Sequence, residues 1–224
     1  MVDEELRRSA AHVLVASLEH PTLDAADAHH LGRVLRLKSG EVVTATDGRG
    51  RWRRCIWRDD ALELDGDTRV DDVAGPPVTI GFAPVKGDRP EWAAQKLTEL
   101  GVDRMVILEA DRSVVRWQGE RGRSQMERLR RVAREATLQA RRCHVPRIEG
   151  PMSPADLGGA LAHFGGEPVS LTHPVLMIGP EGGWSEAELA GGRPRVSLGS
   201  TVLRAETAAV AAGVLLTSLR EAGR

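Results

Sequence analysis

Short apolar segments dominate the first seventy residues, and tight turns separate them. Alternating or β-branched runs predict strands, and a two-glycine stretch, Asp47-Gly48-Arg49-Gly50, predicts a hairpin turn between two of them. Asp24 is placed to cap a short helix that reaches about Arg33. The pattern is typical of a small β-barrel. The expected strands are His12–Val15, Val42–Thr46, Arg51–Trp57 and Ala61–Leu64.

A proline pair interrupts this pattern and marks the expected domain boundary. Val73-Ala74-Gly75-Pro76-Pro77 stiffens the chain and ends strand pairing, so we expect domains at 1–73 and 74–224. After it, strands and helices alternate, which predicts an α/β domain with a mainly parallel sheet. The expected strands are 78–83, 104–108, 168–171, 175–178 and 196–198, and the expected helices are 88–100, 124–142, 154–163, 185–190 and 205–220.

The longest expected helix is amphipathic. Ser124 and Glu127 have the spacing of a capping box that would begin it. Met126, Leu129, Ala133, Ala136 and Ala140 recur every three or four residues, so they form the expected buried face, and the neighbouring arginines lie off it.

The composition argues against a membrane protein, an exported protein and a protein held together by disulfides or zinc. The 224 residues contain no apolar run near the roughly 20 residues that a membrane helix requires. The amino terminus carries Asp3, Glu4 and Glu5 where a signal peptide needs positive charge, so we expect a cytoplasmic protein. Cys55 and Cys143 stand alone, which argues against a disulfide framework or a zinc site, and no metal is expected.

The basic residues are unevenly distributed, although the net charge is only −1. All but three of the 31 are arginine, and they concentrate in 33–58 and 112–147. Arginine binds phosphate bidentately and stacks on bases, so two such patches can bind nucleic acid without a basic isoelectric point. A solvated surface of mixed charge is the alternative.

A glycine-rich turn is the most informative segment. The apolar run ending at Ile178 enters Gly179-Pro180-Glu181-Gly182-Gly183, and Ser185 with Glu188 forms a capping box that begins a helix. The turn matches neither the dinucleotide fingerprint nor the P-loop. Glu181 would repel a phosphate and suits a cationic ligand, whereas a plain strand-to-helix turn would also explain the pattern.

A second candidate turn follows Leu198-Gly199. It leads to a helix of small residues, 205–213, with Arg204 and Glu206 at its start. Ligands of α/β sheets gather at such strand ends, although a surface ion pair between Arg204 and Glu206 is the simpler explanation.

These two segments together resemble the knotted SPOUT methyltransferases, and in particular the ribosomal RNA small-subunit methyltransferase E (RsmE) family. The resemblance rests on Ile178–Gly183, Leu198-Gly199 and Val202–Ala208. Further matching segments run in order along the chain: His30–Arg36, Lys86–Asp88, Gln95–Val102, Arg112–Val115, Gln139, Arg142 and Val145-Pro146. The chain departs from the family pattern at Thr201, where Arg is common, and at Leu138, where Glu is common.

The resemblance implies a homodimer with an N-terminal PUA-like β-barrel that helps to hold RNA and a C-terminal SPOUT domain with a trefoil knot. It also implies S-adenosylmethionine as the cofactor and N3 of a uridine in the decoding region of 16S ribosomal RNA, within the small ribosomal subunit, as the methyl acceptor. Because uracil N3 carries a proton at neutral pH, a base or a cation near it would lower the barrier.

We name candidate residues for each role. Arg204 would hold the uracil oxygens or a phosphate, and Glu206 is the weaker candidate for the base. The candidate cofactor residues are Leu171, His173, Ile178, Gly179, Pro180, Glu181, Gly182, Gly183, Leu198, Gly199, Val202 and Leu203. The candidate RNA contacts are Arg7, Arg8, Arg33, Arg36, Arg112, Arg116 and Arg142.

Two other functions remain open. A 2′-O-ribose methyltransferase of the same superfamily would carry an asparagine-containing stretch where this chain has Arg204–Thr207. A noncatalytic RNA-binding or ribosome-assembly protein would bind RNA without a saturable S-adenosylmethionine site.

Overall fold

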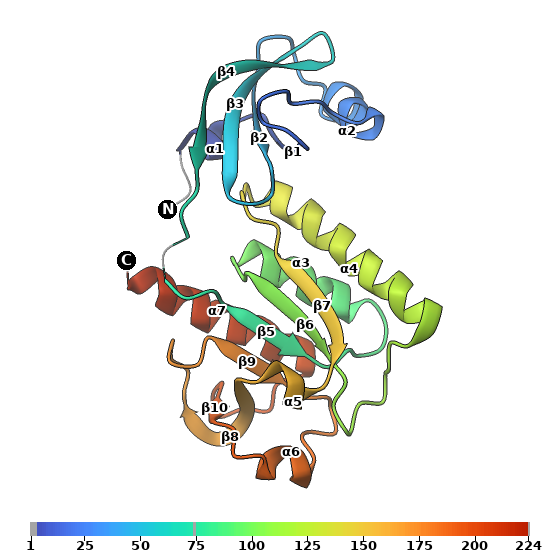
Figure 1. Ribbon diagram of the computed structural model, residues 1–224, viewed down its shortest axis with the longest axis vertical. Helices are drawn as coiled ribbons and strands as arrows, with labels where there is room; N and C mark the ends of the chain where they lie inside the picture. The colour runs from blue at the N-terminus through green and yellow to red at the C-terminus, as the bar shows by residue number, and fades with distance from the viewer. Residues whose placement is uncertain (1–3, 74, 224) are drawn as a thin grey trace. The chain divides into compact units, whose positions relative to one another are not determined.

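The computed structural model describes residues 4–73 and 75–223, which form two compact units (Figure 1). The first comprises Met1–Val73 together with Thr137–Val145, and the second comprises Ala74–Ala136 with Pro146–Arg224. The chain passes from the first unit to the second near residue 73, and the later nine-residue segment Thr137–Val145 also belongs to the first unit.

The first unit contains a four-stranded sheet in the order β1-β2-β3-β4. The strands β1 (Ala11–Leu14), β2 (Val42–Thr46), β3 (Arg51–Arg58) and β4 (Ala61–Val70) agree closely with the expected ones, although β4 is longer. β1 pairs with β2 in parallel, and the other pairs are antiparallel. The apolar positions of the alternating strands meet in one core, which includes Val13, Leu18, Leu31, Val43, Cys55 and Trp57.

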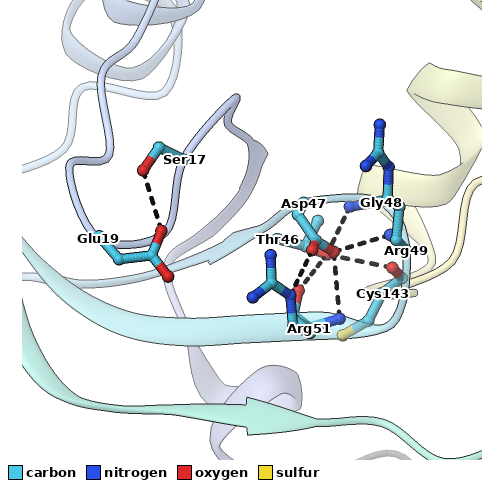
Figure 2. Close-up of polar contacts among 8 residues, drawn as sticks. All are labelled: Ser17, Glu19, Thr46, Asp47, Gly48, Arg49, Arg51 and Cys143. Carbon is cyan, nitrogen blue, oxygen red and sulfur yellow. Dashed lines mark hydrogen bonds and ion pairs between the residues drawn. The ribbon is translucent and has the colours of Figure 1, made fainter.

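The β2–β3 turn is held by side chains of its own residues (Figure 2). Asp47 Oδ1 accepts hydrogen bonds from the backbone N–H groups of Arg49 (2.8 Å) and Arg51 (3.2 Å), and Asp47 Oδ2 lies 2.8 Å from Arg51 Nε. Burial acts to raise the pKa of Asp47, but these hydrogen bonds outweigh it and lower the pKa. The predicted turn is therefore confirmed, and Gly48 and Gly50 supply its positive φ angles.

Short helices flank this sheet. α1 spans Glu4–Arg8, and α2 spans Ala25–His29. The backbone N–H of Asp27 donates to Asp24 Oδ1 at 2.7 Å, which confirms the predicted cap. The expected helix then continues as a π-helical turn, η1 (His30–Val34).

Residues 137–145 join the first unit through polar contacts that the sequence pattern did not indicate. His12 Nε2 lies 2.9 Å from the carbonyl oxygen of Arg142, and His12 Nδ1 lies 2.8 Å from Thr44 Oγ1. The Thr46 hydroxyl donates to the Cys143 carbonyl at 3.2 Å, as Figure 2 shows. Both cysteines are free and buried, and burial raises their thiol pKa values, to about 11 for Cys55 and about 12 for Cys143. They are therefore packing residues.

The second unit is built on a six-stranded sheet in the order β10-β8-β9-β5-β6-β7. All five strand pairs are parallel. The strands are β5 (Thr79–Phe82), β6 (Arg104–Leu108), β7 (Arg147–Met152), β8 (Ala160–Pro168), β9 (Val175–Ile178) and β10 (Arg195–Ser197).

Each face of this sheet has its own core, because successive strand residues point to opposite sides. Ile80, Met105 and Leu176 pack with helices α3 (Arg89–Glu99), α4 (Gly119–Gln139) and α7 (Ala205–Ala222). Val106 and Met177 pack on the other face with Trp184, with Leu157 of α5 (Pro154–Leu157) and with Leu189 of α6 (Glu186–Ala190). The central strands are thus covered on both sides (Figure 1).

The expected start of the long helix is wrong. α4 begins at Gly119, so Ser124 and Glu127 lie inside the helix and do not form a capping box. Gly122 allows this earlier start, because a Cβ there would lie 2.6 Å from the Trp117 carbonyl group. The expected buried face is confirmed at Met126, Leu129, Ala133 and Ala136.

The region between β7 and β9 also differs from expectation. The predicted helix 154–163 ends at Leu157, because Gly158 (φ 71°) and Gly159 (φ 97°) follow in the left-handed region. β8 then occupies Ala160–Pro168 in place of the predicted strand 168–171. No helix among the described residues is long and apolar enough to cross a membrane.

Candidate active site at the carboxyl edge of the sheet

The strand order places a topological switch point between β5 and β9. From β5 the chain continues to β6 and β7 on one side, and it then builds β8, β9 and β10 on the other. Crevices outside the carboxyl ends of strands at such a point are the usual ligand sites of parallel α/β sheets. The glycine-rich turn follows β9 here, so the fold places it where a ligand is expected.

The glycine-rich turn is compact and anchored by a tryptophan. The Gly183 N–H donates to the Pro180 carbonyl at 2.8 Å, and Gly183 has a φ of 69°. A Cβ on Gly179 would lie 3.1 Å from the Trp184 ring, so a larger residue would displace that ring. Trp184 is buried and donates from Nε1 to the Ala162 carbonyl at 2.9 Å. Glu181 and Gly182 are exposed at the tip of the turn.

The next helix fixes the turn to the loop after β6. The predicted capping box of Ser185 and Glu188 is confirmed at the start of α6. Glu188 Oε1 also accepts from the Asp111 N–H at 3.0 Å, and the Ser185 hydroxyl donates to Asp111 Oδ2. Arg112 Nη1 donates to the Gly182 carbonyl at 3.2 Å. Asp111 and Arg112, in the loop after β6, therefore hold the turn in place.

The second turn leaves the same edge of the sheet. It follows β10, and β8 alone lies between β10 and β9 in the sheet, so the two turns follow parallel strands that end on the same side of the sheet. Gly199 has a φ of 138° and open space where a Cβ would lie. Leu198 and Leu203 pack partly against the core, whereas Val202 is 84% exposed. The turn thus presents an apolar side chain and bare backbone at this edge.

Arg204 and Glu206 begin α7, but they do not pair with each other. The Arg204 carbonyl accepts from Ala208 N–H at 2.8 Å, and its side chain is exposed. Glu206 Oε1 lies 3.6 Å from Arg89 Nε at the start of α3, and Glu206 Oε2 is buried without a hydrogen-bond partner among the described residues. The surface ion pair considered from the sequence is therefore not formed, and one carboxylate oxygen of Glu206 remains an open acceptor.

Leu171 and His173 are not brought to the glycine-rich turn. They precede β9, where the neighbouring Pro174 carbonyl accepts from Thr79 N–H at the amino-terminal start of β5. The turn follows the other end of β9. His173 instead lines a separate cavity of about 460 Å³ with Gly165, Gly166, Glu167 and the segment Gly192–Arg195.

Ala162, and not the expected Leu171, lies next to the glycine-rich turn. Its carbonyl contacts Trp184, and His163 follows it directly. The run Leu161-Ala162-His163 carries the same signal of apolar residues followed by histidine, but the sequence pattern predicts a helix there, and that helix ends at Leu157.

The candidate RNA contacts fall into both units. In the first unit, Arg8 pairs with Glu4, Arg36 has a φ of 55°, and Arg142 contributes its carbonyl to His12. Arg7 and Arg33 are the remaining candidates in this unit, on α1 and in η1.

In the second unit, Arg112 and Arg116 lie in the loop after β6. Arg112 contacts Gly182, and Arg116 pairs with Glu109 at 2.7 Å. Among residues 4–73 and 75–223, no group of three or more His, Cys, Asp or Glu side chains is placed to hold a metal ion.

Two family models match the chain. The model described as an RNA methyltransferase domain matches residues 74–217, and the one described as an RNA methyltransferase PUA domain matches residues 23–56. Together with the parallel sheet and its switch-point turns, these matches define a SPOUT-type RNA methyltransferase with an N-terminal PUA domain, and they confirm the expected fold class.

Individual relatives agree with this class. The ribosomal RNA small subunit methyltransferase E of Mycobacterium bovis is 31% identical over 220 residues, which cover 85% of this chain and 83% of that protein. A crystal structure described as a probable rRNA-methyltransferase from Porphyromonas gingivalis has a TM-score of 0.79 at 27% identity and covers 96% of this chain and 100% of that one. A proposed methyltransferase from Legionella pneumophila, in complex with the bound cofactor SAM, has a TM-score of 0.76 at 25% identity, with 94% and 98% covered. The chain belongs to the ribosomal RNA small subunit methyltransferase E family.

Proposed function

We propose that the protein transfers a methyl group from S-adenosylmethionine to N3 of a uridine in the decoding region of 16S ribosomal RNA. Membership of the small subunit methyltransferase E family supports ribosomal RNA as the substrate. The observation that carries the proposal is the pair of glycine turns, after β9 and β10, at one edge of the sheet.

The two turns suit the cofactor. Gly183 and Gly199 leave open space where other residues would place a Cβ, so a ligand can approach their backbone. The exposed carboxylate of Glu181 favours a cationic ligand, and Val202 offers an apolar surface for the adenosyl part. We assign Ile178–Gly183, Leu198, Gly199, Val202 and Leu203 to this site, and Ala162 with His163 replaces Leu171 and His173. When bound, the sulfonium cofactor supplies a methyl group that needs no metal for its activation.

Deprotonation of the uracil is the step that this chain must assist. The Glu206 carboxylate can accept the N3 proton, because its Oε2 has no hydrogen-bond partner among the described residues, and Arg89 keeps the carboxylate in place through Oε1. The exposed guanidinium of Arg204, two residues earlier, can hold the uracil oxygens on which the negative charge develops. In this proposal, Arg204 is the cation that stabilises the developing negative charge, and Glu206 is the base that accepts the N3 proton.

A homodimer is part of the proposal. α7 carries three large apolar side chains on its outer face, Val214, Leu215 and Leu219, each about 40% exposed. A second copy of the chain would cover this stripe. Analytical ultracentrifugation should give a dimer for the wild type and a monomer for Leu215→Glu with Leu219→Glu; a monomeric wild type would contradict this part.

The test of the function is methyl transfer from labelled S-adenosylmethionine to unmodified 16S ribosomal RNA, both free and in small subunits. The proposal expects label in RNA and a saturable cofactor site by calorimetry. RNA binding without cofactor binding would favour the noncatalytic alternative, and label in ribose would favour the 2′-O-methyltransferase.

A further inference from the structure

A cavity of about 430 Å³ lies beside the candidate site, within the second unit. Its walls come from the loops after β5 and β6 and from the first turns of α4. The volume is in the range of pockets that bind small organic ligands. The lining residues are Val85, Lys86, Gly87, Val114, Val115, Arg116, Trp117, Arg121 and Gln125.

The charge of this cavity is entirely positive. Lys86, Arg116 and Arg121 line it, and no acidic residue does. Arg116 is paired with Glu109, but neither Lys86 nor Arg121 forms an ion pair within the described part of the chain. Two cations without acidic partners at one cavity favour an anionic ligand such as a phosphodiester.

The cavity also has an apolar wall and one amide. Val85 and Trp117 are buried beneath it, whereas Val114 is 75% exposed although it is a large apolar residue. Gln125 is half-buried and carries both a donor and an acceptor. A ligand with a flat apolar face, a polar edge and a phosphate matches this combination, and a nucleotide has all three.

One loop connects this cavity to the candidate active site. Asp111 and Arg112 contact Ser185 and Gly182 around the glycine-rich turn, while Val114–Trp117, two residues further on, line the cavity. A single RNA strand could therefore occupy both places.

We propose that this cavity binds one nucleotide of the RNA strand next to the target uridine. Lys86 and Arg121 hold its phosphate, Val114 packs against the base, and the Gln125 amide contacts the base edge. This subsite rests on the proposed function, because it assumes that the active site acts on RNA.

The first test compares two double variants of the full chain. Lys86→Gln with Arg121→Gln removes the two cations of the cavity. Lys96→Gln with Arg123→Gln removes the same charge elsewhere, at residues that pair with Glu99 and Glu120. The probe is an unmodified 16S ribosomal RNA fragment that contains the decoding region, titrated by fluorescence anisotropy at several salt concentrations.

We expect the cavity variant to bind RNA at least tenfold more weakly, with a salt slope reduced by about 1.4 for two lost contacts to a single strand. Its S-adenosylmethionine affinity and melting temperature should equal those of the wild type. RNA affinity within twofold of wild type, or an equal loss in the control variant, would overturn the proposal.

A second test locates the nucleotide directly. RNA with 4-thiouridine on either side of the target uridine is photo-crosslinked to the wild type and the crosslinked peptide is identified by mass spectrometry. Crosslinks within residues 114–125 support the subsite, and crosslinks only outside this loop and helix start overturn it. The proposed function is tested separately by the methyl-transfer assay. It fails if the wild type transfers no methyl group from S-adenosylmethionine to the RNA.

Discussion

At the scale of single residues, the glycine-rich turn depends on space and on backbone angles. A Cβ on Gly182 would lie 3.4 Å from Arg112 Cβ, an ordinary contact, and the residue is exposed. The position therefore tolerates a methyl group in the folded chain. We propose that the cofactor fills the space beyond that methyl group.

Gly182→Val tests this assignment. We expect S-adenosylmethionine affinity to fall at least tenfold, because the branched side chain fills the space of the ligand, while the melting temperature changes by less than about 2 °C. Calorimetry and thermal unfolding measure the two effects. Unchanged cofactor affinity would contradict the placement of the cofactor at this turn.

Arg204→Ala tests the proposed cation. The backbone role of Arg204 at the start of α7 survives the substitution, because the Ala208 N–H donates to its carbonyl. We expect turnover at saturating substrates to fall about 10²-fold or more, the loss typical of a group that stabilises developing negative charge. Cofactor affinity should stay within twofold, and Arg204→Lys should recover part of the turnover. Full turnover in the alanine variant would remove Arg204 from the site.

At the scale of elements, close packing explains why the first half of α7, residues 205–213, is rich in small side chains. A Cβ on Gly213 would lie 2.6 Å from Leu97 Cδ2 of α3, and Ala205, Ala209 and Ala212 are buried against the sheet. The small residues therefore let α7 pack closely on α3 and on the strands β5 and β9.

Gly213→Val should destabilise the protein by about 1–3 kcal/mol, because two γ-methyl groups must enter a filled core. The corresponding loss in melting temperature is several degrees for a chain of this size. Ser124→Val, at an exposed position of α4 and outside the apolar stripe of α7, is the control and should change stability by less than about 0.5 kcal/mol. Equal effects of the two variants would show that the packing at Gly213 is not tight.

The buried His12 gives the first unit a pH-dependent stability. Burial lowers the pKa of His12 from 6.5 to about 4, although hydrogen bonds to Arg142 and Thr44 act in the opposite direction. The unfolded chain therefore binds a proton between pH 6.5 and 4 that the folded chain does not. Stability should fall over this window by about 3 kcal/mol and should not change further below it through this residue.

Denaturant unfolding at pH 7, 5 and 4 measures this dependence. His12→Gln should be less stable at pH 7, but it should lose less stability than the wild type on acidification. Parallel pH profiles for the two proteins would contradict the assignment.

Local patterns predicted most elements of both units correctly. Strand alternation located β2 and β5 to within a residue, and the capping residues Asp24 and Ser185 located two helix starts. The capping pattern failed at Ser124, because Gly122 packs against the Trp117 backbone and lets α4 begin earlier. A local contact, between residues five positions apart, therefore allows the earlier start.

At the scale of the whole molecule, sequence patterns could not reveal long-range partners. The glycine-rich turn was identified from its sequence, but its supports, Asp111, Arg112 and Ala162, lie in other segments. The carbonyl groups of residues 142 and 143 hold Thr137–Val145 in the first unit, and a backbone acceptor leaves no signature in the sequence. Arg89, the partner of Glu206, lay in a region that the motifs did not assign to the site.

The chain as a whole is therefore explained as an RNA-modifying enzyme whose second unit contains the chemistry. The most direct measurement is nucleoside mass spectrometry with site mapping, after small subunits that lack the modification are incubated with the protein and S-adenosylmethionine. The account predicts 3-methyluridine at one uridine of the 16S decoding region. Methylation of a ribose, of another base, or of no nucleotide at all would contradict it.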